Sequence, residues 1–153
     1  MATPAPDRSP TIMNEIVLPS HTNALGTIFG GVVMGWVDIA AAIAAQRYAR
    51  SNVVTASIDY LNFINPIKTG WTVTVTAQVS FVGKTSMEIE VLVDAEKNQT
   101  GERKRATHAY LTFVAVDENG RPKKVSPYVP KTAEEKKAYE EAKIRRERRL
   151  QWR

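Results

Sequence analysis

The sequence predicts an α+β domain in which one curved antiparallel sheet wraps around a single central hydrophobic helix, followed by a charged C-terminal helix. Three observations lead to this prediction: one stretch is apolar nearly all round, four segments after it have strand character, and short turns join those segments. Short turns connect antiparallel neighbours, and a sheet with one apolar face has to be covered by another element. We therefore divide the chain into residues 1–10, a body of residues 11–130, and a helix or tail at residues 131–153.

The chain begins with a segment that we expect to be disordered and continues into one short strand. Residues 1–10, MATPAPDRSP, are rich in proline and lie at a chain end, where order is usually lowest. Residues 11–19, TIMNEIVLP, suit a short strand that ends at its proline.

A loop with three glycines leads into the predicted helix, which runs from about Gly31 to Arg50. Alanine, isoleucine and methionine are frequent in this stretch and suit a helix. The segment 32–45 is apolar apart from Asp38, whereas a helix on a protein surface normally has one polar face. This pattern predicts a helix enclosed on most sides by other structure.

Four strands are predicted after the helix, at residues 53–63, 71–82, 87–93 and 106–116, with turns between them and Asn119-Gly120 after the last. Segment 71–82 alternates almost perfectly between valine-rich and threonine-rich positions, as expected for a sheet with one buried face. In segment 53–63, strict alternation predicts that the mainly apolar residues share one face and the polar residues the other. The first set is Val54, Ala56, Ile58 and Tyr60, and the second is Thr55, Ser57 and Asp59.

Residues 131–153 predict a helix that is exposed to solvent, because few apolar side chains are available to dock it. This tail holds nine Lys/Arg and five Glu, a net charge of +4 out of the total of +5. The body is therefore nearly neutral, which does not favour a basic binding surface. Mixed charges usually solvate a helix face, so we expect no nucleic-acid partner, although a tail that binds nucleic acid is an alternative with a testable salt dependence.

The composition excludes several classes of protein. There is no cysteine, which rules out disulfides, thiolate catalysis and cysteine-ligated metals. The sequence has neither a signal-peptide pattern nor an apolar run of the roughly 18 residues that span a membrane. A cytoplasmic protein is the expectation.

Asp38 is the residue that most needs an explanation, since an ionised carboxylate is costly in an apolar site. It either points into a wet groove or a neighbouring chain, or it has a catalytic role. Gly30 and Gly31 stand at the start of the helix, where backbone N–H groups lack internal partners and can hold a developing oxyanion. Asp38 follows about two turns, roughly 10 Å, further along. The same glycines also suit tight helix–sheet packing.

Other catalytic patterns do not fit. GTIFGG lacks both the Lys-Ser/Thr of a P-loop and the spacing of a dinucleotide site, and no nucleophile elbow occurs. His21 and His108 are the only histidines and have no metal-ligand pattern around them. We expect a structural role for His108, and we do not expect His21 to be the base.

The stretch HTNALGTIFGGVVMGWVDIAA (residues 21–41) resembles the signature of the hotdog-fold acyl-CoA thioesterases, in the acyl-CoA hydrolase branch. The resemblance continues through ASIDYLNFINPIKTG, VGKTSMEIEV and TFVAVDENGRPKKVSP, and it covers residues 12–127. The resemblance implies a hydrolase of fatty acid metabolism that converts fatty acyl-CoA to free acid and CoA. It also implies a homo-oligomer, with a dimer as the minimum and a hexameric trimer of dimers as the expected form.

The resemblance also implies the roles of three residues. Asp38 would act as general base on water, or alternatively as nucleophile. Asn23 would position that water or the carbonyl, and the Gly31 N–H would polarise the thioester oxygen. Asn23 and Asp38 of one site would come from different protomers. No metal, cofactor or prosthetic group is expected.

The phosphates of CoA require cations or N–H donors. Lys84, Thr85 and Ser86 are our first choice, since they also match the family, together with Gly30 at the helix start. Arg103 and Arg105 form the other basic cluster of the body, and solvated surface charges explain that cluster equally well.

Besides the tail that binds nucleic acid, two other functions compete with the thioesterase. A non-catalytic hotdog sensor would bind acyl-CoA without turnover, and the presence of both Asn23 and Asp38 argues for the enzyme instead. A hotdog dehydratase would use a loop histidine with a carboxylate, a motif that the chain does not match. The thioesterase hypothesis fails if Asp38 is sealed in the interior.

Overall fold

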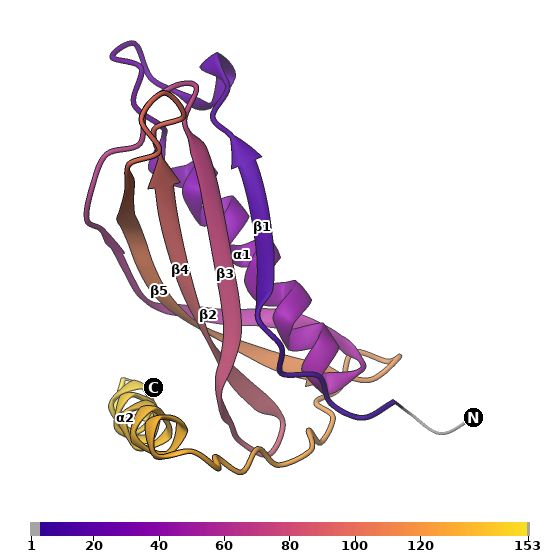
Figure 1. The fold of residues 1–153 in the computed structure, drawn as a ribbon. Helices are drawn as coiled ribbons and strands as arrows, with labels where there is room; N and C mark the ends of the chain where they lie inside the picture. Colours follow the sequence, from indigo (N-terminus) through magenta and orange to yellow (C-terminus); the bar gives the residue numbers. More distant parts are fainter. Residues whose placement is uncertain (1–3, 153) are drawn as a thin grey trace.

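The computed structural model describes residues 4–152 and shows a long helix lying along one face of a five-stranded sheet (Figure 1). In chain order the elements are β1 (Thr11–Ile16), the short 3-10 helix η1 (Pro19–His21), α1 (Gly30–Ala49), β2 (Asn52–Phe63), β3 (Thr72–Val82), β4 (Ser86–Glu96), β5 (Arg103–Val116) and α2 (Ala133–Leu150). The predicted α+β class is confirmed, and only η1 had no counterpart in the prediction. Within residues 4–152, no helix is long and apolar enough to cross a membrane.

All neighbouring strands are antiparallel, and the order across the sheet is β1-β3-β4-β5-β2. The consecutive strands β3, β4 and β5 form a meander in the middle, while β1 and β2 are the two edges. The sheet curves around α1, which is the arrangement of the hotdog fold (Figure 1). Because β2 follows α1 directly and ends the sheet, the helix and this edge strand lie next to each other.

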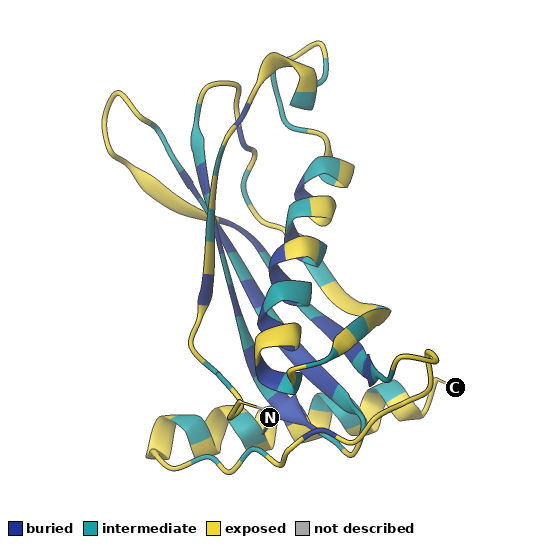
Figure 2. Cartoon of the chain, turned by 90° about the vertical axis from the view of Figure 1, so that its right-hand side faces the viewer, coloured by how far each residue is buried: buried dark blue, intermediate teal, exposed yellow. Residues whose placement is uncertain are grey.

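One face of α1 provides the centre of the core. Its buried residues recur every three or four positions, the spacing of a single helix face: Val33, Val37, Ala40, Ala41, Ala44, Ala45 and Tyr48. Burying each valine contributes roughly 1.5–3 kcal/mol. The opposite face is apolar as well but is not covered, with Met34 39% and Ile39 53% exposed. The predicted enclosure on most sides is therefore wrong for a single chain, as the exposed face of α1 in Figure 2 shows.

Two β-bulges interrupt β2 and overturn the predicted alternation. Thr55 pairs with Phe113 and Ser57 with Thr112, so Ala56 has no partner, and a second shift leaves Asp59 without one. An extra residue in one strand changes which side chains share a face. As a result Thr55 and Ile58 lie on the α1 side, opposite the buried Phe113 and Leu111, while Ser57 and Tyr60 lie on the outer side. A local pattern could not reveal this, because each bulge is defined by the neighbouring strand.

The N-terminal segment contacts the folded body. Residues 1–3 of the segment expected to be disordered lie outside the described residues, and residues 4–10 form neither helix nor strand. Arg8 nevertheless donates from Nε to the carbonyl of Val79 at 2.9 Å and pairs through Nη1 with Glu135 of α2 at 3.2 Å. The Asp7 N–H donates to the carbonyl of Arg47 at the end of α1. These contacts hold residues 7 and 8 between α1, the sheet and α2.

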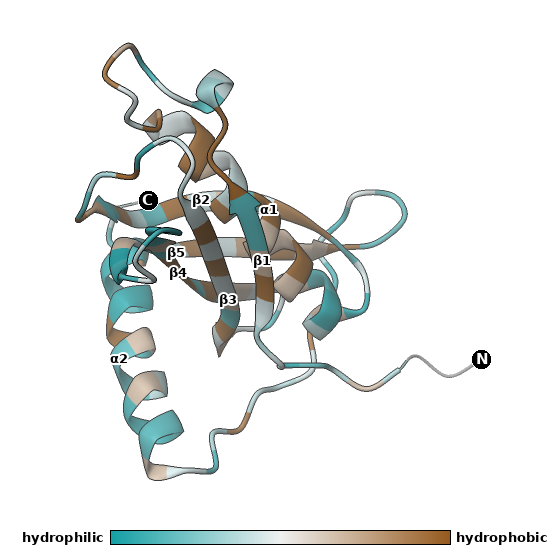
Figure 3. Cartoon of the chain, turned by 45° about the horizontal axis from the view of Figure 1, so that its top comes forward, coloured by the Kyte–Doolittle hydropathy of each residue, from teal (hydrophilic) through white to brown (hydrophobic). Residues whose placement is uncertain are grey.

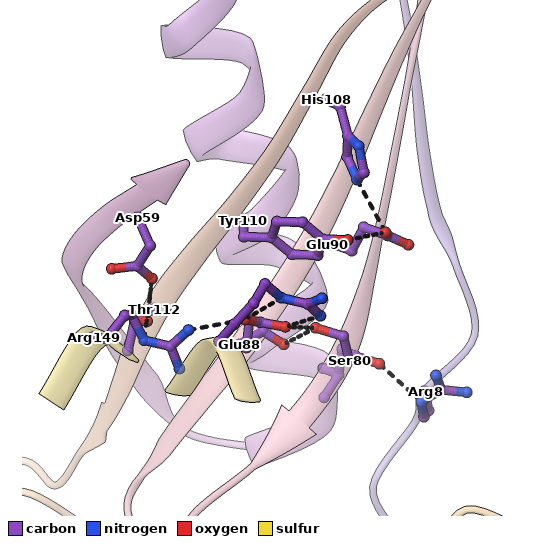
Figure 4. Close-up of polar contacts among 11 residues, drawn as sticks. Arg8, Asp59, Ser80, Glu88, Glu90, His108, Tyr110, Thr112 and Arg149 are labelled. Atoms are coloured by element: carbon purple, nitrogen blue, oxygen red, sulfur yellow. Dashed lines mark hydrogen bonds and ion pairs between the residues drawn. The ribbon is translucent and has the colours of Figure 1, made fainter. Parts of the chain in front are cut away.

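The predicted C-terminal helix is confirmed and most of its residues are exposed, but it is docked on the outer face of the sheet by ion pairs that the sequence did not predict. It begins with a capping box in which Thr132 and Glu135 bond each other's backbone N–H groups. As expected from its hydrophilic composition (Figure 3), only Ala142 is buried on it. Its main charged contact with the sheet is Glu88 of β4, whose fully buried side chain pairs with Arg145 and with Arg149. Figure 4 shows the pair with Arg149. The composition of the helix could not reveal a partner located on a distant strand.

Candidate active site

Asn23 organises the glycine loop at one end of the molecule. Its Oδ1 accepts hydrogen bonds from the N–H groups of Leu25 at 2.9 Å and Thr27 at 3.1 Å, and its own N–H donates to the Thr27 carbonyl. Gly26 closes this turn with a φ of +73°, a conformation that favours glycine. The side-chain nitrogen of Asn23 makes no hydrogen bond within residues 4–152, so it is left to donate to a ligand or to another chain.

The first turn of α1 presents unpaired backbone donors. Phe29 donates its N–H to the His21 carbonyl and Val32 donates to Phe29, whereas Gly30 and Gly31 make no backbone hydrogen bond through their N–H groups in the described part of the chain. A Cβ on Gly30 would lie 3.1 Å from the ring of Phe63, so a larger residue there would require this half-exposed ring to shift. Gly31 is exposed and has no neighbour within 4 Å of such a Cβ. Its N–H is therefore the accessible donor at the helix N-terminus.

Asp38 lies on α1 where the helix faces β2, and it is partly exposed rather than sealed in the core. The hydroxyl of Thr55 on β2 donates to its Oδ1 at 2.8 Å. This bond orients the carboxylate and leaves its other oxygen available, as a general base requires. Strict alternation along β2 placed Thr55 with Ser57 and Asp59, so the sequence did not single it out. The bulge at Ala56, which only the pairing with β5 defines, is what turns Thr55 toward Asp38.

The predicted site residues do not all meet within one chain. No hydrogen bond or ion pair joins Asn23 to Asp38 among the described residues. Asp38 lines none of four cavities of about 190 to 790 Å³, and the largest of these lies between β2, β5 and α2 on the other face of the sheet. One chain thus provides a carboxylate, a hydroxyl and free N–H donors without an enclosing pocket.

The two predicted CoA-binding clusters lie at opposite ends of the sheet. Lys84 and Thr85 form the turn between β3 and β4, which a bond from the Gly83 N–H to the Ser86 carbonyl closes at 2.8 Å. The other cluster begins β5, beside the far end of β4. There Arg105 pairs with Asp94 at 2.6 Å and Arg103 with Glu96 at 3.5 Å. Lys84 is exposed and free of ion pairs within residues 4–152, which makes it the more available cation.

The two histidines make structural contacts. The Leu18 N–H donates to His21 Nδ1 at 3.0 Å, and the ring lies edge-on to Trp36. His108 contacts Glu90 on the outer face of the sheet at 3.0 Å (Figure 4). In the described part of the chain no three His, Asp or Glu side chains gather as a metal-binding group. Independence from metals and cofactors stays a prediction.

Comparison with known proteins places this arrangement in a family. The sequence model of the thioesterase superfamily matches residues 25–102, which include the start of α1, Asp38 and Thr55. The chain belongs to the thioesterase superfamily. The chain is also 44% identical to a solved hexameric acyl-CoA thioesterase, with a TM-score of 0.90 over 99% of this chain and 97% of that one.

Two further proteins of this superfamily deserve comparison. Cytosolic acyl coenzyme A thioester hydrolase of Mus musculus is 41% identical over 133 residues, which are 86% of this chain but 35% of that protein, so the chain spans about a third of its length. The acyl-CoA hydrolase of Staphylococcus aureus, solved with butyryl coenzyme A and coenzyme A, is 40% identical with a TM-score of 0.86 over 94% of this chain and 87% of that one.

Alanine variants of the Staphylococcus aureus protein have also been solved, with an asparagine, an aspartate or a threonine replaced. In that chain the asparagine and the aspartate are 15 positions apart, and the aspartate and the threonine are 17 apart. Asn23, Asp38 and Thr55 have the same two spacings in this thioesterase-superfamily chain.

Proposed function

We propose that this protein is an acyl-CoA thioesterase that hydrolyses fatty acyl-CoA to free fatty acid and CoA, with Asp38 as the general base. The observation that carries the proposal is the partly exposed Asp38 carboxylate of α1, which accepts a hydrogen bond from the Thr55 hydroxyl of β2 at 2.8 Å. The N-terminus of the same helix α1 has free N–H donors at its glycines. The superfamily and the spacing shared with the Staphylococcus aureus hydrolase support it.

The chemistry follows from these groups. Asp38 takes a proton from water while the water oxygen attacks the thioester carbonyl carbon. The carbonyl oxygen becomes an oxyanion, which the Gly31 N–H and the positive end of the α1 dipole stabilise. When the tetrahedral intermediate collapses, the C–S bond breaks and the CoA thiolate takes the proton from Asp38. Direct attack by Asp38 on the carbonyl, through an anhydride, is the alternative route.

We assign the missing enclosure of the site to a second copy of the chain. Asn23 and Asp38 are not in contact within one chain, and β2 ends the sheet as a long edge strand with Tyr60 and Phe63 about half exposed. An unpaired edge of this kind is normally covered. In the proposed dimer, Asn23 of the partner subunit reaches the site that contains Asp38. A trimer of such dimers is the proposed full assembly, which the hexameric state of a solved relative supports.

The substrate's CoA portion is assigned to Gly30 and to the turn formed by Lys84, Thr85 and Ser86, where an exposed ammonium and hydroxyls meet its phosphates. Arg103 and Arg105 are second candidates, since both already pair with carboxylates. The name of the mouse relative supports a cytoplasmic location for this chain.

Thiol release from a panel of acyl-CoAs tests the function. The wild type is expected to release thiol, and Asp38→Asn to lower kcat at least roughly a hundredfold, as loss of a general base does. Glu118→Gln removes a carboxylate from an exposed turn and serves as the control with unchanged turnover. If Asp38→Asn remains fully active, the mechanism is wrong. If the wild type binds acyl-CoA without releasing thiol, the protein is a sensor rather than an enzyme.

Complementation tests the shared site. Asn23→Ala and Asp38→Asn are each expected to be nearly inactive, but co-refolded together they form mixed dimers that contain one intact site. Random pairing then restores about a quarter of wild-type activity. No recovery in mixed dimers, verified by mass spectrometry of the assembly, would place Asn23 and Asp38 of one site on the same chain.

A further inference from the structure

The outer face of the sheet carries a network that connects α2 to the bulged part of β2, which begins after Thr55 (Figure 4). Asp59 is the residue without a partner at the second bulge. Its Oδ1 accepts from the Ser57 hydroxyl at 2.5 Å, and its Oδ2 accepts from the Thr112 hydroxyl of β5 at 2.6 Å. The Asp59 side chain is 14% exposed, and its bond to Thr112 is partly buried while its bond to Ser57 is exposed.

Arg149 of α2 bridges two carboxylates on different strands. Its Nε lies 3.4 Å from Asp59 Oδ2 on β2, and its Nη1 donates to Glu88 Oε2 on β4 at 2.9 Å. Glu88 pairs in register with Thr112, and Thr112 pairs with Ser57, so these three residues lie side by side across β4, β5 and β2. The planar guanidinium suits this bridge because its N–H groups have fixed directions.

The inner side of the same segment holds the candidate base. Thr55 is the last residue before the first bulge, and its hydroxyl donates to Asp38. Between the two bulges only Ser57 and Ile58 pair with β5. Thr55 itself ends the regularly paired run 52–55, and the short segment that follows it is tied to β5 and α2 by the outer bonds of Asp59.

We propose that Asp59 and Arg149 are positioning residues for the thioesterase reaction: the C-terminal helix, through Arg149 and Asp59, fixes the bulged segment of β2 so that Thr55 orients Asp38. This inference rests on the proposed function. It gives α2 a role in turnover although α2 itself contributes no residue to the candidate site. Small displacements of a catalytic group lower turnover strongly, by up to roughly a hundredfold for about 1 Å.

Kinetics of Arg149→Ala test the proposal, with Arg148→Ala as the matched control, since Arg148 is exposed, on the same helix and without an ion pair within residues 4–152. Arg149→Ala is expected to lower kcat roughly tenfold and to leave KM within about twofold, because substrate contacts are untouched. Arg148→Ala is expected to match the wild type. If Arg149→Ala fails to fold, Asp59→Asn, which keeps the size of the side chain, makes the same test.

A double-mutant cycle separates positioning from general structural damage. Thr55→Ala alone lowers kcat, and in that background Asp59→Asn is expected to lower it by no more than about a further twofold, because the group it positions is gone. If Asp59→Asn lowers kcat by the same factor with and without Thr55→Ala, the two substitutions act independently and the proposal is overturned.

Hydrogen exchange decides the same question without activity. Amides of residues 54–60 are expected to exchange faster in Arg149→Ala than in Arg148→Ala, while those of β3 stay unchanged. Unchanged exchange across 54–60 would overturn the proposal even in an active enzyme. A wild type that releases no thiol would refute the proposed function, and the exchange result would still decide whether Arg149 holds β2.

Discussion

Replacing Glu88 by glutamine tests how the C-terminal helix is held. Glu88 is buried in the middle of β4, and its two oxygens accept four side-chain hydrogen bonds: one from Ser80 at 2.6 Å, two from Arg145 at 2.8 and 3.1 Å, and one from Arg149 at 2.9 Å. Glutamine keeps the shape but removes the charge and turns one acceptor into a donor that faces a guanidinium. The two arginines then lack their counter-charge.

The magnitude follows from burial. Removing one partner of a buried ion pair costs about 3–5 kcal/mol. Arg145 and Arg149 are 25% and 17% exposed, so water solvates them in part, and the expected loss is at the lower end, about 3 kcal/mol. Burial lowers the pKa of Arg145, but the hydrogen bond and charge of Glu88 outweigh burial and raise this pKa above its ordinary value.

Urea unfolding at one protein concentration measures the effect, with Glu96→Gln as the control. Glu96 is on the same strand and pairs with Arg103 at 3.5 Å, but the two side chains are 35% and 55% exposed, so this loss is expected to stay below about 1 kcal/mol. Faster tryptic cleavage within residues 131–149 should accompany Glu88→Gln. If both variants unfold within about 1 kcal/mol of the wild type and resist trypsin equally, ion pairing does not hold α2.

Three further variants probe other parts of the chain. Gly31→Ala should not lower the unfolding free energy, because its Cβ meets no atom within 4 Å and alanine favours the helix, yet it should lower kcat/KM by crowding the exposed N–H donor; equal activity would contradict the proposed oxyanion role. Burial and a hydrogen bond to Glu90 raise the pKa of Tyr110, so the neutral phenol stabilises the fold below about pH 10 and this contribution is lost as pH rises further. Urea unfolding at several pH values from 9 upwards should therefore show that the unfolding free energy falls less with pH in Tyr110→Phe than in the wild type. The same pH dependence in both proteins would refute the assignment. Thr132→Ala removes the N-cap of α2 and should lower the free energy of unfolding in urea by about 1 kcal/mol. An unchanged free energy of unfolding would show that the cap does not stabilise the fold.

Much of the fold was predictable because its signals are local. The alternation of segment 71–82 matches β3, in which Val73, Val75, Ala77 and Val79 are buried. The apolar stretch with one aspartate matches α1, and Asn119-Gly120 does form the turn after β5. In each case neighbouring residues carry the information, either as a period of two or 3.6 or as turn chemistry.

The parts that the sequence did not predict depend on pairs that are distant along the chain. Glu88 and Arg149 are 61 positions apart, so the composition of residues 131–153 looked like that of a solvated helix. Thr55 reaches Asp38 only because β5 leaves Ala56 unpaired. Asn23 and Asp38 were chosen from the family pattern, and their roles stay proposals until turnover is measured.

The bulged residues of β2 are surplus to the ladder. Ala56 and Asp59 face no residue of β5, so a chain shortened at both positions would still place Thr55 across from Phe113, Ser57 across from Thr112 and Tyr60 across from Tyr110. The two extra residues make the edge strand β2 longer than the part of β5 with which it pairs. An edge strand that is longer than the strand it pairs with has to bend. A chain shortened at both positions would keep the pairing and lose this bend.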